Sequence, residues 1–141
     1  MQKSIIVIGI IVILAIAAYA ALGSQNQKNT QNLSNNLNWH TDLNSAIDEA
    51  KKTGKNVIVD FYAPWCSACT YLDEDTFQDP QVQEKLNKNY IIAKIDIDRN
   101  PDLASKYKVY AVPTIIFMDS SGNEIKRQEG YIPPEEFLQM I

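Results

Sequence analysis

The stretch that most constrains the fold covers residues 57–72 and reads V-I-V-D-F-Y-A-P-W-C-S-A-C-T-Y-L. Its first six residues form a short, almost continuous apolar run rich in β-branched side chains, which predicts a strand buried on both faces. Cys66 and Cys69 follow at once and are the only two cysteines in the chain. We therefore expect a core strand that leads directly into a helix over residues 66–73 carrying both cysteines.

The spacing of the two cysteines predicts redox chemistry. Residues three apart on a helix face the same side, close enough for a reversible disulfide. Cys66 would lie at the helix N-terminus, where free N–H groups and the helix dipole favour the attacking thiolate. Cys69, one turn further in and more buried, would resolve a mixed disulfide. Trp65 would shield one side of the pair and offer an apolar contact to a substrate.

Two other uses of the cysteines fit the sequence less well. A zinc site needs four ligands, and only His40 could join the two thiolates among the soft ligands. A purely structural disulfide across three residues constrains little of the unfolded chain. We expect no metal and no cofactor.

Asp60 is an ionisable residue in the middle of the predicted core strand. Its desolvation costs several kcal/mol unless it is paired or neutral, so burial should raise its pKa. That would suit Asp60 to accept the proton of Cys69 when a mixed disulfide resolves. Lys94, in the strand pattern A-K-I-D-I-D, is the expected partner. The alternatives are an exposed Asp60 without a role and a solvated Lys94.

Hydrophobic periodicity and cap residues predict the remaining elements. The expected helices are one capped by Thr41 and ended by Gly54, one capped by Asp79 from Pro80 onwards, 101–106 and 133–141, and the further strands are 90–97, 114–118 and 124–128. Strands joined by helices should pair in parallel, and the tight turn at 120–123 should give an antiparallel edge. The expected fold class is α/β, a central mixed sheet flanked by helices on both faces.

The N-terminal segment differs in composition from the rest of the chain. Ile5–Leu22 carries no charge, and as a helix it would span about 27 Å at 1.5 Å per residue, close to a hydrocarbon core of about 30 Å. Lys3 before it favours an inside N-terminus, with everything that follows exported. A cleavable signal peptide is the alternative, with a small-x-small cleavage pattern at 18–20. A buried core helix is disfavoured because the segment has no polar face.

We therefore expect three parts. Residues 1–23 are an N-terminal transmembrane anchor or signal segment, 24–38 a flexible Gln/Asn-rich linker, and 39–141 the folded domain. The chain has 13 basic and 17 acidic residues, a net charge of −4, and no basic run. Nucleic acid is accordingly not an expected partner, because phosphate contacts need clustered Lys and Arg.

Three motifs together resemble the thioredoxin superfamily: D-F-Y-A-P-W-C-x-x-C, A-K-I-D-I-D and A-V-P-T-I-I-F, in the family's order and spacing. Within the superfamily, residues 39–141 are most similar to the C-terminal thioredoxin-like domain of the DsbD family of thiol:disulfide interchange proteins. The pointers are W-x-x-x-L-x-x-A-I-x-x-A-K from Trp39 and T-F-Q-D-P-Q-V-Q after the active-site helix.

The resemblance implies a thioredoxin-like fold and assigns roles to individual residues. Cys66 would attack, Cys69 would resolve and Asp60 would be the buried acid. Pro113 would be a cis-proline against the active site, and the backbone beside it, at Val112, would pair with an extended substrate segment. The residues alone leave Pro113 an ordinary proline at a strand start.

Three departures from the family pattern matter. The dipeptide between the cysteines is Ser67-Ala68, so no relative's reduction potential can be transferred. Thr70 stands where many relatives carry lysine. The acidic run 73–75 adds negative charge near the site, which should oppose the thiolate.

The hypothesis that follows is a membrane-anchored thiol–disulfide oxidoreductase with its domain on the extracytoplasmic side, or periplasmic or secreted if the segment is cleaved. It would reduce or exchange protein disulfides, as a reductase or electron relay in cell redox homeostasis, and a membrane electron donor would re-reduce it. The alternatives are an oxidase or isomerase and a non-enzymatic peptide-binding or assembly module.

Overall fold

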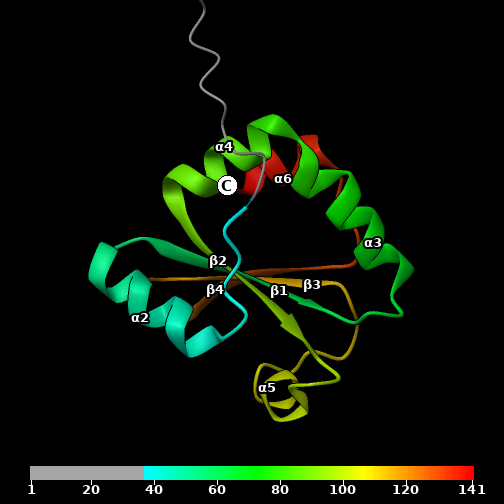
Figure 1. The fold of residues 1–141 in the computed structure, drawn as a ribbon, viewed down its shortest axis with the longest axis horizontal. Coiled ribbons are helices and arrows are strands. Elements are labelled where there is room, and N and C mark those ends of the chain that lie inside the picture. The colour runs from blue at the N-terminus through cyan, green and yellow to red at the C-terminus, as the bar shows by residue number, and fades with distance from the viewer. Residues whose placement is uncertain (1–36) are drawn as a thin grey trace, which may run out of the picture. The chain divides into compact units, whose positions relative to one another are not determined.

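The structure, a computed structural model, describes residues 37–141 (Figure 1). The expected anchor or signal segment and nearly all of the expected linker lie outside these residues. Among residues 37–141, no helix combines the length and the apolar character that crossing a membrane requires.

Five α-helices, one short 3₁₀ turn and four strands make up the described part of the chain. They are α2 (Leu43–Thr53), β1 (Asn56–Tyr62), α3 (Ser67–Glu74), η1 (Thr76–Gln78), α4 (Pro80–Asn89), β2 (Tyr90–Asp96), α5 (Pro101–Lys106), β3 (Thr114–Met118), β4 (Glu124–Glu129) and α6 (Pro134–Met140). Within residues 37–141, each strand and each helix expected from the sequence is present, with ends that differ by one or two residues, the usual uncertainty of element boundaries.

The first helix, α2, begins with a different cap from the one that the sequence suggested. Asp42, not Thr41, is the N-cap, and its carboxylate accepts a hydrogen bond of 2.8 Å from the Ser45 N–H. The hydroxyl of Ser45 donates in return to the Asp42 carbonyl at 2.9 Å. The helix ends at Gly54, whose φ of +72° is a left-handed conformation that glycine adopts without a Cβ penalty.

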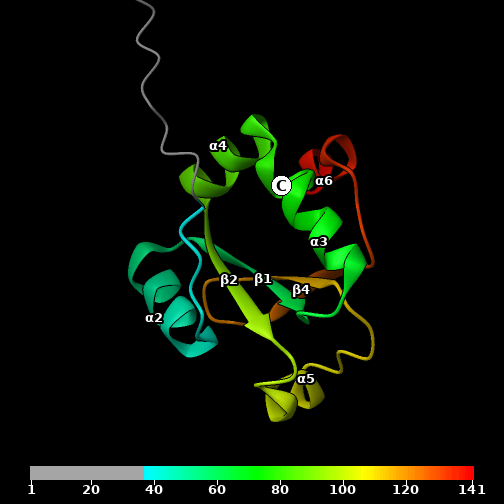
Figure 2. The ribbon, with the colours of Figure 1, turned by 45° about the vertical axis from the view of Figure 1, so that its right-hand side comes forward.

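The four strands form one mixed sheet in the order β2-β1-β3-β4. β1 and β2 are parallel, whereas β1–β3 and β3–β4 are antiparallel. The expectation that helix-linked strands pair in parallel is therefore wrong for β3. The reason is the position of α5, which lies beyond the carboxyl ends of β1 and β2 instead of running back along a face (Figures 1 and 2). The chain consequently enters β3 from the end at which β2 leaves the sheet.

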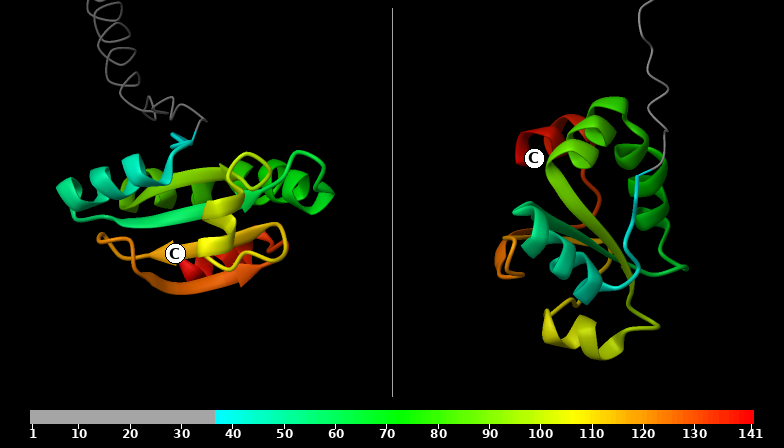
Figure 3. Two further views of the ribbon diagram at one scale, coloured as in Figure 1. Left: turned by 90° about the horizontal axis from the view of Figure 1, so that it is seen from below. Right: turned by 60° about the vertical axis from the view of Figure 1, so that its left-hand side comes forward.

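Helices cover both faces of the sheet (Figures 1 and 3). Beneath α2 lies one buried cluster: Leu43, Ala46, Ala50, Val57, Val59, Phe61, Ile91, Ala93, Ile95, Ile116 and Met118. On the opposite face α3, α4 and α6 bury the other: Ile58, Leu72, Phe77, Val82, Leu86, Ile92, Ile115, Phe117, Ile132 and Phe137. Because strand side chains alternate between faces, Asp60 and Lys94 point to the same face as Ile58 and Ile92, the face of β1 and β2 that α3 and α4 cover.

An extended arm precedes α2 and runs along the outer edge of β2. His40 forms an isolated parallel bridge with Ala93: its N–H donates to the Ile92 carbonyl at 2.9 Å, and its carbonyl accepts from the Lys94 N–H at 2.8 Å. The arm thus protects part of a sheet edge that would otherwise present unpaired backbone groups. His40 Nε2 lies 2.9 Å from a carboxylate oxygen of Glu49 on α2.

Candidate active site

The two cysteines form a disulfide at the start of α3. Their Cα atoms are 5.3 Å apart, a normal separation for a disulfide. Cys66 is the N-cap of the helix, and its Sγ accepts a hydrogen bond of 3.1 Å from the Cys69 N–H. Cys66 is 7% exposed and Cys69 2%. The outer sulfur is therefore the one that a helix N–H would stabilise as a thiolate.

The segment before β3 forms the wall opposite Cys66. The Val112 carbonyl oxygen lies 3.5 Å from Cys66 Sγ. The Val112–Pro113 peptide bond is cis, the geometry that the family resemblance implies. Thr114 Oγ1 donates to the Ala111 carbonyl at 2.7 Å, which ties this segment to the first residue of β3.

Trp65, next to the disulfide, is 70% exposed. Its indole Nε1–H donates to Asp98 Oδ2 at 2.9 Å, across a separation of 33 residues. The ring is thus held in one place although most of it faces solvent. Asp98, in the loop after β2, was not identified from the sequence, which contains no signal that the loop folds back to this position.

Asp60 and Lys94 form an ion pair inside the molecule. They occupy directly opposite positions of β1 and β2, and Lys94 Nζ is 2.8 Å from Asp60 Oδ2. Asp60 is completely buried, and its other carboxylate oxygen has no hydrogen-bond partner in the described part of the chain. Burial raises the pKa of the Asp60 carboxyl, although the charge and the hydrogen bond of Lys94 act in the opposite direction.

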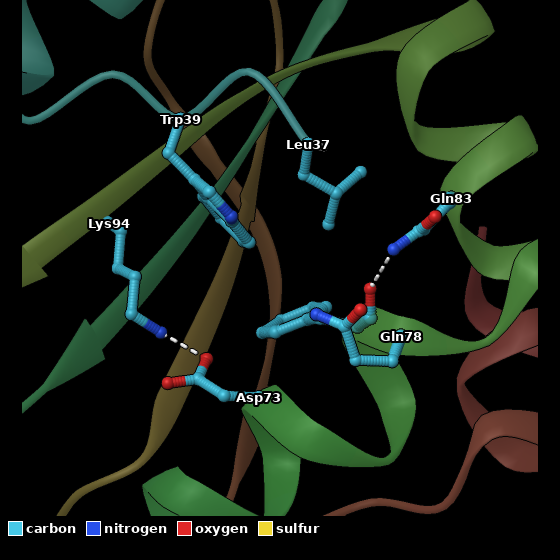
Figure 4. Close-up of a pocket in the computed structure, with 7 residues that line it drawn as sticks. Leu37, Trp39, Asp73, Gln78, Gln83 and Lys94 are labelled. Carbon is cyan, nitrogen blue, oxygen red and sulfur yellow. Dashed lines mark hydrogen bonds and ion pairs between the residues drawn. The ribbon is translucent and has the colours of Figure 1, made fainter. Parts of the chain in front are cut away.

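Lys94 lies between a second carboxylate and several aromatic rings. Its ammonium group also forms an ion pair with Asp73 of α3, as Figure 4 shows. The nitrogen is 4.8 Å from the Tyr62 ring centroid, 5.4 Å from that of Trp39 and 5.7 Å from that of Phe77, within the range of cation–π attraction. Burial lowers the pKa of Lys94, but the two carboxylates outweigh that effect and hold its pKa above the ordinary value.

A pocket of about 220 Å³ opens beside this ion pair (Figure 4). Its lining residues are Leu37, Trp39, Asp73, Phe77, Gln78, Gln83 and Lys94. Trp39, which the family resemblance placed at the start of a helix, lies in the extended arm and packs edge-to-face on Phe77, with ring centroids 5.0 Å apart. Solvent reaches Lys94, whose side chain is 17% exposed, while Asp60 stays covered.

The acidic run 73–75 is engaged in specific contacts. Asp73 pairs with Lys94, and the Asp75 carboxylate accepts a hydrogen bond from the Tyr131 hydroxyl. Glu74 is the third carboxylate of the run. The sequence pattern indicated negative charge near the site, but not which residues would contact these carboxylates.

The residues expected at the site therefore fall into two groups. Cys66, Cys69 and Val112 pack together, whereas Asp60 and Lys94 form a pair on the face of the sheet below α3. Within residues 37–141, no hydrogen bond joins Asp60 to either sulfur; its single bonded oxygen contacts Lys94. His40, the remaining soft ligand, is paired with Glu49, and no group of three or more potential metal-ligating side chains occurs among these residues.

A mixed sheet between helices, with a disulfide at the N-terminus of α3 and a carbonyl beside its outer sulfur, defines a thiol–disulfide oxidoreductase of the thioredoxin type. The family model described as "Thioredoxin-like domain" matches residues 43–141. The chain belongs to this thioredoxin-like family.

Individual relatives agree with that assignment. The thiol:disulfide interchange protein DsbD of Yersinia pestis is 39% identical over 98 residues, which cover 65% of this chain and 16% of that protein. The thioredoxin of Mycoplasmoides gallisepticum is 30% identical over 105 residues, covering 72% of this chain and 97% of that protein. The solution structure of a thioredoxin from Thermus thermophilus superimposes with a TM-score of 0.67 at 28% identity, over 74% of this chain and 83% of that one. The chain spans about a sixth of the length of the DsbD relatives that it matches.

Proposed function

We propose that this protein reduces or exchanges disulfides of other proteins through Cys66 and Cys69, on the extracytoplasmic side of a membrane. The observation that carries the proposal is the difference between the two sulfurs. Cys66 is the N-cap of α3 and its sulfur accepts the Cys69 N–H, while Cys69 lies within the helix and is the less exposed of the two buried cysteines. An attacking thiolate and a resolving thiol need this asymmetry.

The chemistry proceeds in two exchanges. The Cys66 thiolate attacks one sulfur of a substrate disulfide, forms a mixed disulfide, and the substrate's other sulfur leaves as a thiolate. Cys69 then loses its proton and attacks Cys66 Sγ, which releases the second substrate thiolate and forms the Cys66–Cys69 disulfide. The substrate gains two electrons and the protein's dithiol loses them.

Asp60 is the group that we assign to the proton of Cys69. Burial holds its pKa above the ordinary carboxyl value, which brings it closer to that of a thiol and makes proton transfer less uphill. Lys94 contacts Asp60 directly, and Asp73 contacts Lys94 in turn. Trp65 and Pro113, with the Val112 carbonyl, would border the substrate on opposite sides of Cys66.

Membrane attachment through residues 5–22 is the second part of the proposal. It is supported by the uncharged length of that segment. A domain in an oxidising compartment can act as a reductase only if a membrane partner keeps supplying electrons. Mass measurement of the membrane-extracted protein tests the anchor, which a mature N-terminus at Ala21 would contradict.

The reduction potential of the Cys66–Cys69 pair tests the direction of electron flow. A reductase or relay should have a potential nearer that of thioredoxin, about −270 mV, than that of DsbA, about −120 mV. The wild-type protein should also accelerate the reduction of insulin by dithiothreitol, and Cys66→Ser should not. A potential near −120 mV would favour the oxidase alternative, and failure to reduce insulin would contradict the enzymatic proposal.

A further inference from the structure

The segment from Tyr107 to Pro113 connects α5 to β3 and reaches the disulfide at its far end. Val112 places its carbonyl 3.5 Å from Cys66 Sγ. Two residues earlier, Tyr110 is 88% exposed, the highest value among the large apolar side chains of the described chain. Any protein substrate that approaches Cys66 from this side meets this segment, so its backbone conformation matters for binding.

The segment begins with an unfavourable backbone conformation. Lys108 has a φ of +53°, in the left-handed region, and it is the one non-glycine residue with positive φ in residues 37–141. The Lys108 N–H donates to the Ser105 carbonyl and the Val109 N–H to the Ala104 carbonyl, the hydrogen-bond pattern of a Schellman cap at the end of α5. Glycine normally occupies this position, because the Cβ of any other residue crowds the following carbonyl oxygen in this conformation.

Arg127 of β4 holds this cap from the outside. Its guanidinium donates to the carbonyl of Tyr107 at 2.9 Å and to that of Lys108 at 3.3 Å, the two carbonyls on either side of the left-handed residue. Glu124 fixes the guanidinium in turn with two hydrogen bonds, of 2.7 Å to Nε and 2.6 Å to Nη2. A planar fork with five donors can make all these contacts at once.

A bulge in β4 makes the Glu124–Arg127 pair possible. Residues three apart on a regular strand point to opposite faces. In the pairing with β3, however, Met118 lies opposite Glu124 and Ile116 opposite Arg127, with the register shifting between Phe117 and Met118. One extra residue in β4 therefore brings Glu124 and Arg127 to the same face as Ile116 and Met118, the face against which Tyr107 packs.

The other end of the segment is also tied to β4. Gly130, directly after the strand, donates its N–H to the Pro113 carbonyl at 2.8 Å. The same strand thus fixes both ends of the segment, by a side chain at Tyr107–Lys108 and by its backbone at Pro113. Between them lie Tyr110, which is exposed, and Val112, whose carbonyl is beside Cys66.

We propose that Arg127 is a positioning residue for protein substrates, which holds the Tyr107–Pro113 segment in the conformation that places the Val112 carbonyl beside Cys66 and leaves Tyr110 exposed two residues before it. Arg127 does not take part in the sulfur chemistry. A small disulfide, which needs only Cys66, should be indifferent to it. The inference rests on the proposed oxidoreductase function, since it concerns how that site meets a protein.

The test compares a protein substrate with a small one in the same variant. For Arg127→Met, the KM for insulin should rise about tenfold with kcat little changed, because the donor fork and with it the loop position are lost. The rate of reaction with a small nitrobenzoate disulfide and the reduction potential should stay within twofold of the wild-type values. The insulin KM of Arg127→Lys should lie between those of the wild type and Arg127→Met, because one ammonium cannot make all the hydrogen bonds of the planar guanidinium. Circular dichroism confirms that each variant is folded.

Two further variants sharpen the test. Arg99→Met removes the chain's other arginine, whose side chain is 86% exposed and pairs with Asp96 at 3.5 Å, and should leave both substrates unaffected. Lys108→Gly in the Arg127→Met background should recover part of the insulin KM, because glycine adopts the left-handed conformation unaided. An unchanged insulin KM in folded Arg127→Met, or an equal loss with both disulfides, would overturn the assignment of Arg127. If the wild type reduces the small disulfide but not insulin, the proposed function itself fails.

Discussion

Asp60 and Lys94 lie directly opposite each other in the parallel register of β1 and β2, with Lys94 Nζ 2.8 Å from Asp60 Oδ2. Both side chains face α3, the helix that carries the disulfide. The lysine shares its charge with Asp73 of that helix, so one cation joins β1 and β2 to the active-site helix. Within residues 37–141 Asp60 meanwhile leaves one oxygen buried without a partner, a feature that costs stability but keeps the carboxyl ready to hold a proton.

Asp60→Asn should make stability less dependent on pH. Because the pKa of Asp60 is raised in the folded protein, the folded state keeps this proton to a higher pH than the unfolded chain. The wild type therefore loses stability as the pH rises from about 3.9, the unfolded-state pKa, through the folded pKa. Between pH 4 and pH 8 the free energy of unfolding of the variant, from urea titrations of the oxidised protein, should fall less than that of the wild type.

Asp48→Asn is the matched control, since this acid lies on the surface of α2 with its side chain 67% exposed. Its free energy of unfolding should change with pH as that of the wild type does, with the Asp60 contribution that both share. A constant difference in the free energy of unfolding between Asp60→Asn and the wild type at every pH would contradict the raised pKa of Asp60.

Lys94→Met should be strongly destabilising at pH 8 and much less so at pH 4. Loss of the ammonium leaves an unpaired buried carboxylate when Asp60 is ionised, and breaking such a pair costs about 3–5 kcal/mol. At pH 4 the carboxyl holds its proton, and most of this penalty disappears. Asp73→Asn retains the buried pair and should cost less than about 1 kcal/mol at either pH, because Asp73 is 41% exposed. Equal losses for the two variants at pH 8 would show that Asp60 does not depend on Lys94.

The helix cap that the sequence misplaced gives a separate test. Asp42→Ala removes the acceptor for the Ser45 N–H and should lower the free energy of unfolding by about 0.5–2 kcal/mol, whereas Thr41→Ala should leave it nearly unchanged. Thermal or urea unfolding of the two variants measures the difference. The reverse order would restore Thr41 as the cap.

The parts of the fold that the sequence predicted are those set by local chemistry. Apolar runs located β1 and β3, Asp79 followed by Pro80 located the start of α4, and the Cys66–Cys69 spacing located the disulfide. Even the Asp60–Lys94 pair could be anticipated, because a charge within an apolar strand needs a partner and few strand positions offer one.

The features of the fold and site that could not be predicted from the sequence depend on contacts between distant elements. The direction of β3 follows from α5 lying beyond the end of the sheet, which no local pattern encodes. The partners Asp98 and Arg127 come from segments far from the cysteines along the chain, and each resembles an ordinary surface charge. Asp73 lies on the cysteine helix itself, but its partner Lys94 comes from β2. Their roles depend on strand register and on the bulge in β4.

Trapping of a mixed disulfide tests most directly the roles of the two cysteines. Cys69→Ser keeps the attacking sulfur at the N-terminus of α3 but removes the group that resolves the intermediate, so it should accumulate disulfide-linked complexes with substrate proteins that disappear on reduction. Cys66→Ser leaves only the covered sulfur and should accumulate few or none. Non-reducing electrophoresis of alkylated extracts, with mass spectrometry of the linked peptides, measures both. Complexes joined through Cys66 in Cys69→Ser alone are the predicted result; equal trapping by both variants, or by neither, would contradict the assignment of attack to Cys66 and resolution to Cys69.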